Sequence, residues 1–184
     1  LVVPKSEDYK NTEVKVHSDD EVPAIAIIPF ENKGAEEDIF YTYGISTDLI
    51  SVCAGAGLIR VVSLKDVEKL DFSNLTTSEL SKKLSVRYIA QGTLWKMGNM
   101  FQLSVELYDT KNKKLIWSDR WQERWESLSI IQSSLSDGLL KALDTKPKIE
   151  QKVQATNPEA YEFYLKAQHV FFNCQNDSEI QIAK

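Results

Sequence analysis

The sequence predicts an α/β fold, a mixed five-stranded sheet with helices packed on it, followed by a helix of a repeat type. Three patterns predict this. The apolar run 24–28 is continuous, as in a strand buried on both faces. Three segments between residues 87 and 124 read as strands joined by turns. The segments 42–53 and 126–143 carry apolar residues on one helical face. The expected element order is β-α-β-α-β-β-β-α.

The first strand is expected over residues 24–30. Pro29 cannot donate a ladder hydrogen bond, so it either ends the strand or lies at an edge. An acidic loop, 31–38, precedes a helix over 42–53. Gly55 and Gly57 end that helix, and residues 58–62 form a second short strand. A strand–helix–strand unit of this length predicts a parallel pair.

Two short helices are expected next. Ser63 with Asp66 approximates a capping box, and Thr76 with Glu79 forms a better one. The period then changes to that of strands, over 87–95, 100–108 and 115–124. Gly98-Asn99 predicts a tight hairpin turn, and 109–113 a longer one. In the third strand Asp119 lies in the same alternating register as Trp117 and Trp121, so it is expected on the same face as these tryptophans. A β-bulge is one explanation for a carboxylate in this register.

The clearest helix is expected over 126–143, where a single apolar stripe should lie across the sheet. Asn157-Pro158 predicts the start of another helix, because Asn caps helices and Pro fits the first helical position. One side of that helix carries an aromatic-rich set of residues, namely Tyr161, Tyr164, Leu165, Gln168 and Phe172.

Composition divides the 184 residues into four segments. Residues 1–21 are mostly polar without period, which indicates a linker or tail. Residues 22–144 form the α/β domain, 145–156 a second linker, and 157–184 a further helix and the start of another. The chain opens with Leu1 and no signal-like segment, so we expect it to be an excised part of a longer protein.

Bulk properties exclude some functions. No apolar run approaches the ~18 residues that a membrane span needs. The net charge is −5, with 22 basic against 27 acidic residues, whereas nucleic-acid binding favours a concentrated basic face. We therefore expect protein partners, or a neighbouring domain of the same chain, rather than nucleic acid.

No pattern predicts a catalytic residue, a cofactor or a metal. Gly55-x-Gly57 follows a helix and precedes a strand, the reverse of a dinucleotide fingerprint. The acidic run 36–38 lacks the alternating ligands of a calcium loop. His17 and His169 are the only histidines and have no ligand partner nearby in the sequence.

Two features stay open at this stage. Cys53 lies on an apolar helix face and is expected to be a buried thiol, although a disulfide with Cys174 is an alternative. Core packing is the favoured expectation for Trp117, Trp121 and Trp125. The alternative is that Trp121 and Trp125 face solvent, and a possible interaction surface is made of Trp121, Trp125, Phe171 and Phe172.

Several segments resemble the TolB-like amino-terminal domain family in order and spacing. They are AIIPFEN at 26–32, YGISTDLI at 43–50, LIRVV at 58–62, LSVRYIAQGTL at 84–94, the stretch 103–117, and NPEAYEFYLKA at 157–167. The residues that match the family motifs are Pro29, Phe30, Asn32, Gly44, Ile45, Asp48, Leu49, Tyr88, Gly92, Trp117, Asn157, Pro158, Tyr161, Tyr164 and Leu165. The stretch 53–57 departs from the family pattern.

The resemblance implies a sheet domain similar to the anticodon-binding domain of class II synthetases, followed by tetratricopeptide repeats of which only a truncated start is present. Family members sit in larger bacterial proteins beside adenylate or guanylate cyclase domains, or in CadC-type regulators beside DNA-binding domains. The implied function is a non-catalytic sensor or scaffold, on the periplasmic side of a membrane-anchored protein or in the cytoplasm. A homodimer is compatible with it. The alternative is RNA or nucleotide binding, by analogy with the anticodon-binding fold alone.

Overall fold

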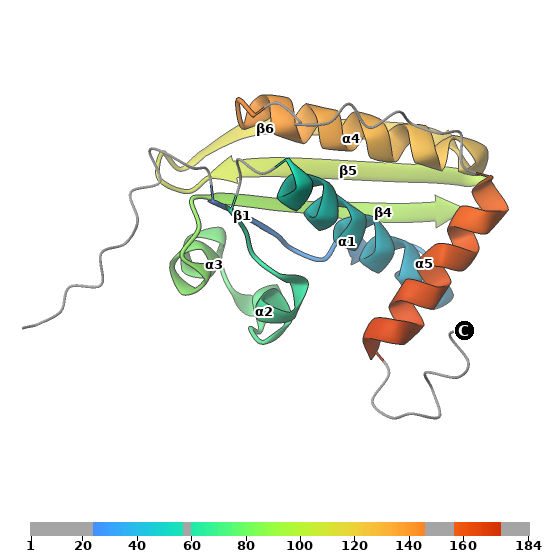
Figure 1. Cartoon of the computed structure of the whole chain (residues 1–184), viewed down its shortest axis with the longest axis horizontal. Coiled ribbons are helices and arrows are strands. Elements are labelled where there is room, and N and C mark those ends of the chain that lie inside the picture. The colour runs from blue at the N-terminus through green and yellow to red at the C-terminus, as the bar shows by residue number, and fades with distance from the viewer. Residues whose placement is uncertain (1–23, 57–59, 146–156, 174–184) are drawn as a thin grey trace, which may run out of the picture.

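The computed structural model describes residues 24–56, 60–145 and 157–173. One mixed sheet organises them (Figure 1). Its strands follow the spatial order β3-β1-β4-β5-β6, and a short strand, β2, pairs with the far end of β4. Their bounds are β1 Ala24–Ile27, β2 Glu31–Asn32, β3 Arg60–Val61, β4 Tyr88–Met97, β5 Met100–Asp109 and β6 Lys114–Arg124. β1 is parallel to β3 and β4, and β2 is parallel to β4, whereas the β4–β5 and β5–β6 pairs are antiparallel. The predicted mixed α/β sheet is confirmed.

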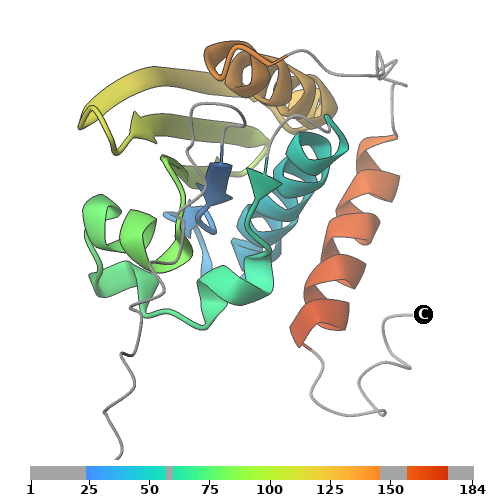
Figure 2. The same cartoon turned by 60° about the vertical axis from the view of Figure 1, so that its left-hand side comes forward.

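The helices form layers on both faces of the sheet. They are α1 Ile39–Gly55, α2 Leu64–Glu68, α3 Thr77–Leu84, α4 Leu128–Ala142 and α5 Pro158–Asn173, with short 3-10 turns at Glu36–Asp38, Phe72–Asn74 and Trp125–Ser127. In Figure 2, α1 and α4 lie on one face and α2 and α3 on the other, while α5 packs outside α1. We call these the inner and outer faces.

β1 is buried on both faces, as predicted. Ile25 and Ile27 join the inner cluster, while Ala24 and Ala26 join the outer one. The strand is shorter than expected, however, and ends at Ile27. Ile28 still donates to the Ala90 carbonyl, but Pro29 has no N–H, so the chain leaves β4 there and pairs with it again in β2. The expected loop 31–38 therefore contains a short strand and a 3-10 turn.

Helix α1 is longer than its apolar pattern predicted, and more than one of its sides is buried. The 3-10 turn at Glu36–Asp38 leads directly into it. Its small and polar residues Thr42, Gly44 and Ser46 are as buried as its apolar ones. The cause is that α1 contacts the sheet, α4 and α5 at once. A helix with several covered sides loses the simple amphipathic signature.

Local signals located the other elements well. Ser63 Oγ accepts from the Asp66 amide, and Thr76 and Glu79 form a complete capping box. Gly98 has a φ of 58° in the β4–β5 turn, a conformation that favours glycine. The register shifts between Leu107 and Tyr108, which leaves one extra residue, Ile116, on β6. This bulge precedes Trp117, so it does not explain the register of Asp119, which pairs with Val105.

Candidate functional site: the contact between helices α1 and α5

Helix α5 begins where the sequence predicted. Asn157 Oδ1 accepts from the Glu159 amide at 2.9 Å and the Ala160 amide at 3.4 Å. Pro158 occupies the first helical position, where no amide donor is needed. Tyr161 and Leu165 lie one turn apart and are both buried against α1. The aromatic side of α5 is thus partly a docking face for the α/β domain.

A close approach of the two helices depends on Gly44. A Cβ on this residue would lie 2.3 Å from Leu165 Cδ2, a distance that real Cβ atoms essentially never show. Leu165 is fully buried in the space that the missing side chain leaves. Gly44 therefore lets α1 accept a leucine from α5 as part of the inner core.

One turn further along α1, Asp48 is a buried carboxylate that three elements share. Tyr161 Oη donates to Asp48 Oδ2 at 2.6 Å, and Gln132 Nε2 of α4 donates to the same oxygen at 2.8 Å. Tyr164 Oη donates to Oδ1 at 3.3 Å. Buried charges are usually compensated by such donors. Asp48 consequently ties α1, α4 and α5 together through neutral donors.

The ionisation of this cluster follows from its burial. Desolvation raises the pKa of Asp48. The hydrogen bonds from Tyr161, Tyr164 and the glutamines lower this pKa, but desolvation has the larger effect, so the pKa is raised overall. Burial and the neighbouring carboxylate raise the pKa of Tyr161. Tyr161 therefore remains a hydrogen-bond donor across the neutral range.

The rim of the contact is aromatic and charged. The Tyr43 ring packs edge-on against His169, with 5.6 Å between centroids. Lys166 Nζ donates to Glu162 at 2.6 Å and lies 5.1 Å from the Phe40 ring centroid. Burial lowers the pKa of His169. These contacts lie around the point where Gly44 of α1 and Leu165 of α5 come close together.

The remaining motif residues shape the domain. The Phe30 amide donates to Ser46 Oγ at 3.0 Å, which fixes the chain after Pro29 on α1. Asn32 Oδ1 accepts from the Gly34 amide at 2.9 Å and closes the turn before α1. Ile45 and Leu49 are buried in the inner cluster, Gly92 lies opposite Val105 on β5, and Trp117 packs with Tyr88 around that cluster. Their functional significance stays a prediction.

The candidate aromatic surface is not one patch. Trp125 stacks on Phe101 at 5.4 Å and meets Tyr41 edge-on at 5.2 Å, so it is half-buried. Trp121 is half-buried beside Trp117. Phe171, by contrast, is 60% exposed on the outer side of α5. The side chain of Phe172 lies outside the described residues.

The other sequence candidates are the cysteines, the histidines and the glycine pair. Burial raises the pKa of the Cys53 thiol to about 12, so the thiolate is scarce at neutral pH. Cys174, His17 and Gly57 lie outside the described residues. Within the described ranges, no group of three His, Cys, Asp or Glu residues could hold a metal ion.

The α1–α5 contact itself was not predicted. The sequence contained one usable signal, since Gly44 and Asp48 lie four residues apart and so share a face of α1. A glycine and a carboxylate on one face of a helix indicate a second packing partner. Which segment provides that partner could not be read from the spacing.

Comparisons with known proteins support the fold. No protein-family model matches the chain. A curated protein of Rhizobium meliloti (strain 1021), named "Putative adenylate cyclase 3", is 21% identical over 165 residues, covering 85% of this chain and 28% of its own length. The chain thus spans just over a quarter of that relative.

Among solved structures, TolB from Acinetobacter baumannii superposes with a TM-score of 0.50 at 18% identity, over 67% of this chain and 29% of TolB. Lipoprotein GNA1162 from Neisseria meningitidis gives a TM-score of 0.48 at 16% identity, over 65% of this chain and 98% of that one. The superposition on TolB supports a TolB-like fold, as the sequence motifs predicted. No described helix is both long enough and apolar enough to span a membrane.

Proposed function

We propose that this chain is a non-catalytic accessory domain of the TolB-like amino-terminal family, within a larger bacterial signalling or envelope protein. In this role the α/β domain holds α5 and passes its state to neighbouring parts of the protein. The observation that carries the proposal is the pairing of two motifs distant in sequence. Gly44 and Asp48 of the first motif contact Leu165 and Tyr161 of the last.

The pairing gives the motif residues a mechanical role rather than a catalytic one. A relay needs an element that can adopt two alternative conformations, whose populations a signal can shift. Helix α5 fits this need, because its contact with α1 combines one tight apolar approach with a shared carboxylate. The cyclase relative and the TolB fold support a bacterial accessory role. A nucleotide cyclase or a transcriptional regulator is the expected neighbour, and tetratricopeptide repeats are the expected continuation of α5.

The test loosens α5 in the full-length protein. Leu165→Ala removes the buried contact with Gly44, whereas Phe163→Ala truncates a side chain that is 70% exposed on the same helix. The output is cyclic-nucleotide production where a cyclase domain is present, or reporter transcription where a DNA-binding domain is. We expect Leu165→Ala to change the output severalfold, and Phe163→Ala to leave it unchanged.

Hydrogen exchange of the α5 amides provides the control for this experiment. Faster exchange in Leu165→Ala shows that the helix has been loosened. If exchange accelerates while the output stays at the wild-type value, α5 is a passive support and the relay proposal is wrong.

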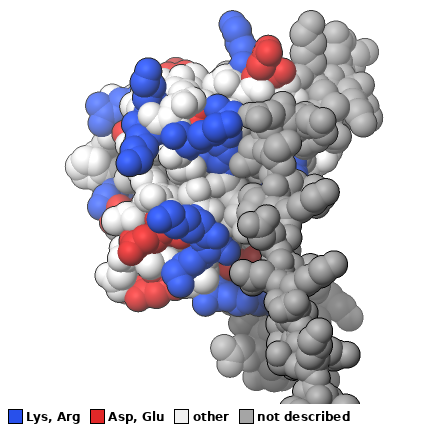
Figure 3. Space-filling model, turned by 90° about the vertical axis from the view of Figure 1, so that its left-hand side faces the viewer, with Lys and Arg blue, Asp and Glu red and all other residues white. Residues whose placement is uncertain are grey.

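RNA or nucleotide binding remains a second candidate because of one surface. Lys and Arg side chains gather on the end of the molecule in Figure 3, where α3 approaches the β5–β6 turn. The exposed lysines of α3 and of that turn are Lys82, Lys83, Lys111, Lys113 and Lys114. A salt-dependent mobility shift with single-stranded RNA, reduced by Lys113→Glu, would support this function. If no mobility shift occurs even at low salt, the RNA-binding function is ruled out.

A further inference from the structure

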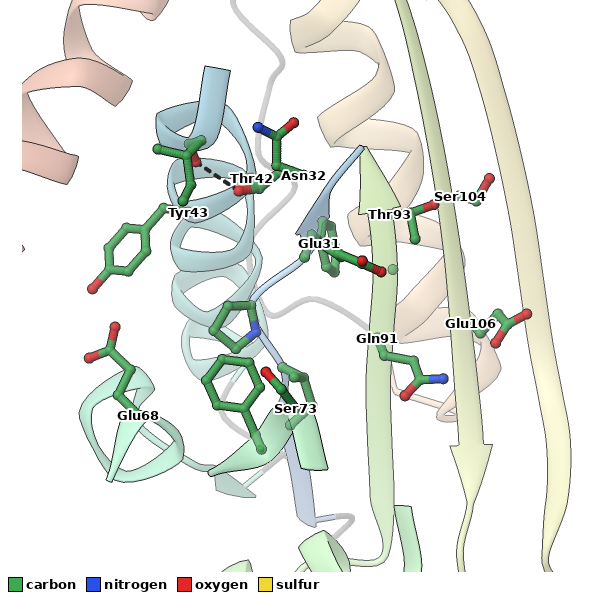
Figure 4. A pocket seen from close by; sticks show the side chains of 16 residues that line it. Glu31, Asn32, Thr42, Tyr43, Glu68, Ser73, Gln91, Thr93, Ser104 and Glu106 are labelled. Carbon is green, nitrogen blue, oxygen red and sulfur yellow. Dashed lines mark hydrogen bonds between the residues drawn. The ribbon is translucent and has the colours of Figure 1, made fainter. Parts of the chain in front are cut away.

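The outer face of the sheet contains a groove of about 720 Å³ at the carboxyl end of β1. Figure 4 shows that its walls come from the loop after β1, the start of α1, the α2 segment, and β4 and β5. Its volume lies within the ~300–1,000 Å³ typical of small-molecule pockets. In α/β sheets, ligands bind preferentially at the carboxyl ends of parallel strands.

One side of the groove is apolar. Pro29, Ile39 and Phe72 line it, and Ile39 is 47% exposed although it is a large aliphatic residue. The Tyr43 ring stands at the same side (Figure 4). This wall suits a hydrocarbon or aromatic body.

The other lining groups are acidic or neutral. Three glutamates line the groove, Glu31, Glu68 and Glu106, and its described lining includes no Lys, Arg or His. Glu31 pairs with Lys33. The Glu68 carboxylate lies beside Tyr43 (Figure 4), and Glu106 accepts a hydrogen bond from Tyr108 Oη at 2.9 Å.

Neither of the last two glutamates has a cationic partner. Within the described ranges, no Lys or Arg forms an ion pair with Glu68 or Glu106. Arg120, the nearest basic residue on β6 by register, donates instead to Ser104 Oγ at 3.2 Å. The two carboxylates lie at opposite ends of the groove, Glu68 beside Tyr43 and Glu106 on β5 (Figure 4).

The strand side adds neutral polar groups. Gln91 and Thr93 project from β4 into the groove, and both are half-buried (Figure 4). No residue in the described part of the chain hydrogen-bonds to either side chain. Half-buried polar groups without partners favour a ligand that provides donors and acceptors.

We propose that this groove binds a small organic cation, an amine or guanidinium group attached to an apolar body. The apolar body lies along Phe72 and Ile39, and the cation lies against the Glu68 carboxylate, beside Tyr43 (Figure 4). Tyr43 and Phe72 add aromatic faces, which attract cations. An anion in the same place would meet uncompensated carboxylates. Binding here does not depend on the relay function proposed for α5, because it is measured on the chain alone.

The test uses two probes with the same body and opposite charge, phenethylamine and phenylacetate. Each is titrated into the 184-residue chain while backbone amide chemical shifts are followed by NMR. We expect phenethylamine to shift the Gly92, Thr93 and Glu31 amides with a Kd on the order of 1 mM, as for a fragment of this size. Phenylacetate should shift none of them.

Substitutions of the groove glutamates test which carboxylate binds the cation. Glu68→Gln should weaken phenethylamine binding about three- to fivefold, the range for partly exposed ion pairs. Glu106→Gln, at the other end of the groove, should weaken it less (Figure 4). Glu123→Gln, an exposed carboxylate on β6 outside the groove, is the matched control and should leave the Kd unchanged. The amide spectrum also reports whether each variant is folded. High salt should weaken binding, because it screens exposed charges.

Three results would overturn the proposal. They are equal affinity for the two probes, shifts that lie away from the groove, and no saturable shift up to about 20 mM phenethylamine.

Discussion

The two faces of the sheet are covered to very different extents. On the inner face one apolar cluster runs from β1 to β6 under α1 and α4, and α5 adds a third layer. On the outer face the cluster is confined to the β1 end, beneath α2 and α3. β5 shows the contrast within one strand, because its inner residues are buried while its outer residues are polar and half-exposed. The inner face therefore contributes most of the stability, while among the described residues no helix covers the outer side of β5.

The sharpest test of this difference replaces neighbouring residues of β5. Phe101 is fully buried on the inner face and packs against Tyr41 and Trp125, whereas Gln102 points outward. Phe101→Ala should lower the free energy of unfolding by about 3–5 kcal/mol, since it leaves a cavity in a packed core. Gln102→Ala should change it by less than about 0.5 kcal/mol. Urea denaturation followed by tryptophan fluorescence measures both, and equal losses would contradict the asymmetry.

The second test asks whether α5 is an integral part of the inner core. Gly44→Ala places a methyl group 2.3 Å from Leu165 Cδ2, so one helix must shift. We expect a loss of about 1–3 kcal/mol, as for overpacked cores. Gly55→Ala is the matched control, because a Cβ there meets nothing within 4 Å. It should stabilise α1 by about 0.5–1 kcal/mol, since alanine favours helices.

Opposite signs for these two substitutions would show that the Gly44 effect comes from α5 and not from helix propensity. If both variants are stabilised to the same extent, α5 adapts freely and is not part of the core. Denaturation monitored by circular dichroism distinguishes the two cases.

Sequence patterns located elements well where the determining interactions are local. The Thr76–Glu79 capping box, the Gly98-Asn99 turn and the Asn157 cap each involve residues within a few positions, and each was predicted. The ends of β1 and α1 were predicted less accurately, because they depend on pairing with β4 and on contact with α5. Periodicity does not encode such long-range contacts.

The sites follow the same rule. The α1–α5 contact joins residues 113 positions apart, Asp48 and Tyr161, which no local pattern relates. The groove depends on how little of the outer face the five-residue helix α2 covers. The sequence placed Gly44 and Asp48 on a shared helical face and Glu31 in an acidic loop. The residues that contact these three could be identified only from the three-dimensional structure.

A third prediction compares the two tyrosines that contact Asp48. Tyr161 is buried and its hydroxyl lies 2.6 Å from Oδ2, whereas Tyr164 is 48% exposed and its hydroxyl lies 3.3 Å from Oδ1. Tyr161→Phe should cost about 1.5 kcal/mol, because it leaves a buried carboxylate short of a donor. Tyr164→Phe should cost less than about 0.5 kcal/mol, because water can replace its hydroxyl. Thermal unfolding of the two variants checks this order, and a larger loss for Tyr164→Phe would contradict it.

The smallest expected effect is the pH dependence of the α5 layer. Burial raises the pKa of Asp48 above its unfolded value, so the folded state binds its proton more readily. This contribution to stability is present below the unfolded pKa and is lost as the pH rises through the folded pKa. Asp48→Asn cannot titrate, so the free energy of unfolding of the wild type relative to this variant should fall as the pH rises from acid to neutral.

The comparison with Asp48→Asn also removes the main competing titration. The pKa of His169 is lowered by burial, so its protonation destabilises the fold as the pH falls, the opposite direction to Asp48. His169 is present in both proteins, and its contribution cancels in the difference. The four side-chain donors around Asp48 oppose the effect of burial on its pKa, which keeps the expected change small. Urea unfolding of both proteins across the acid range measures it, and a difference that rises with pH would show that the donors outweigh burial.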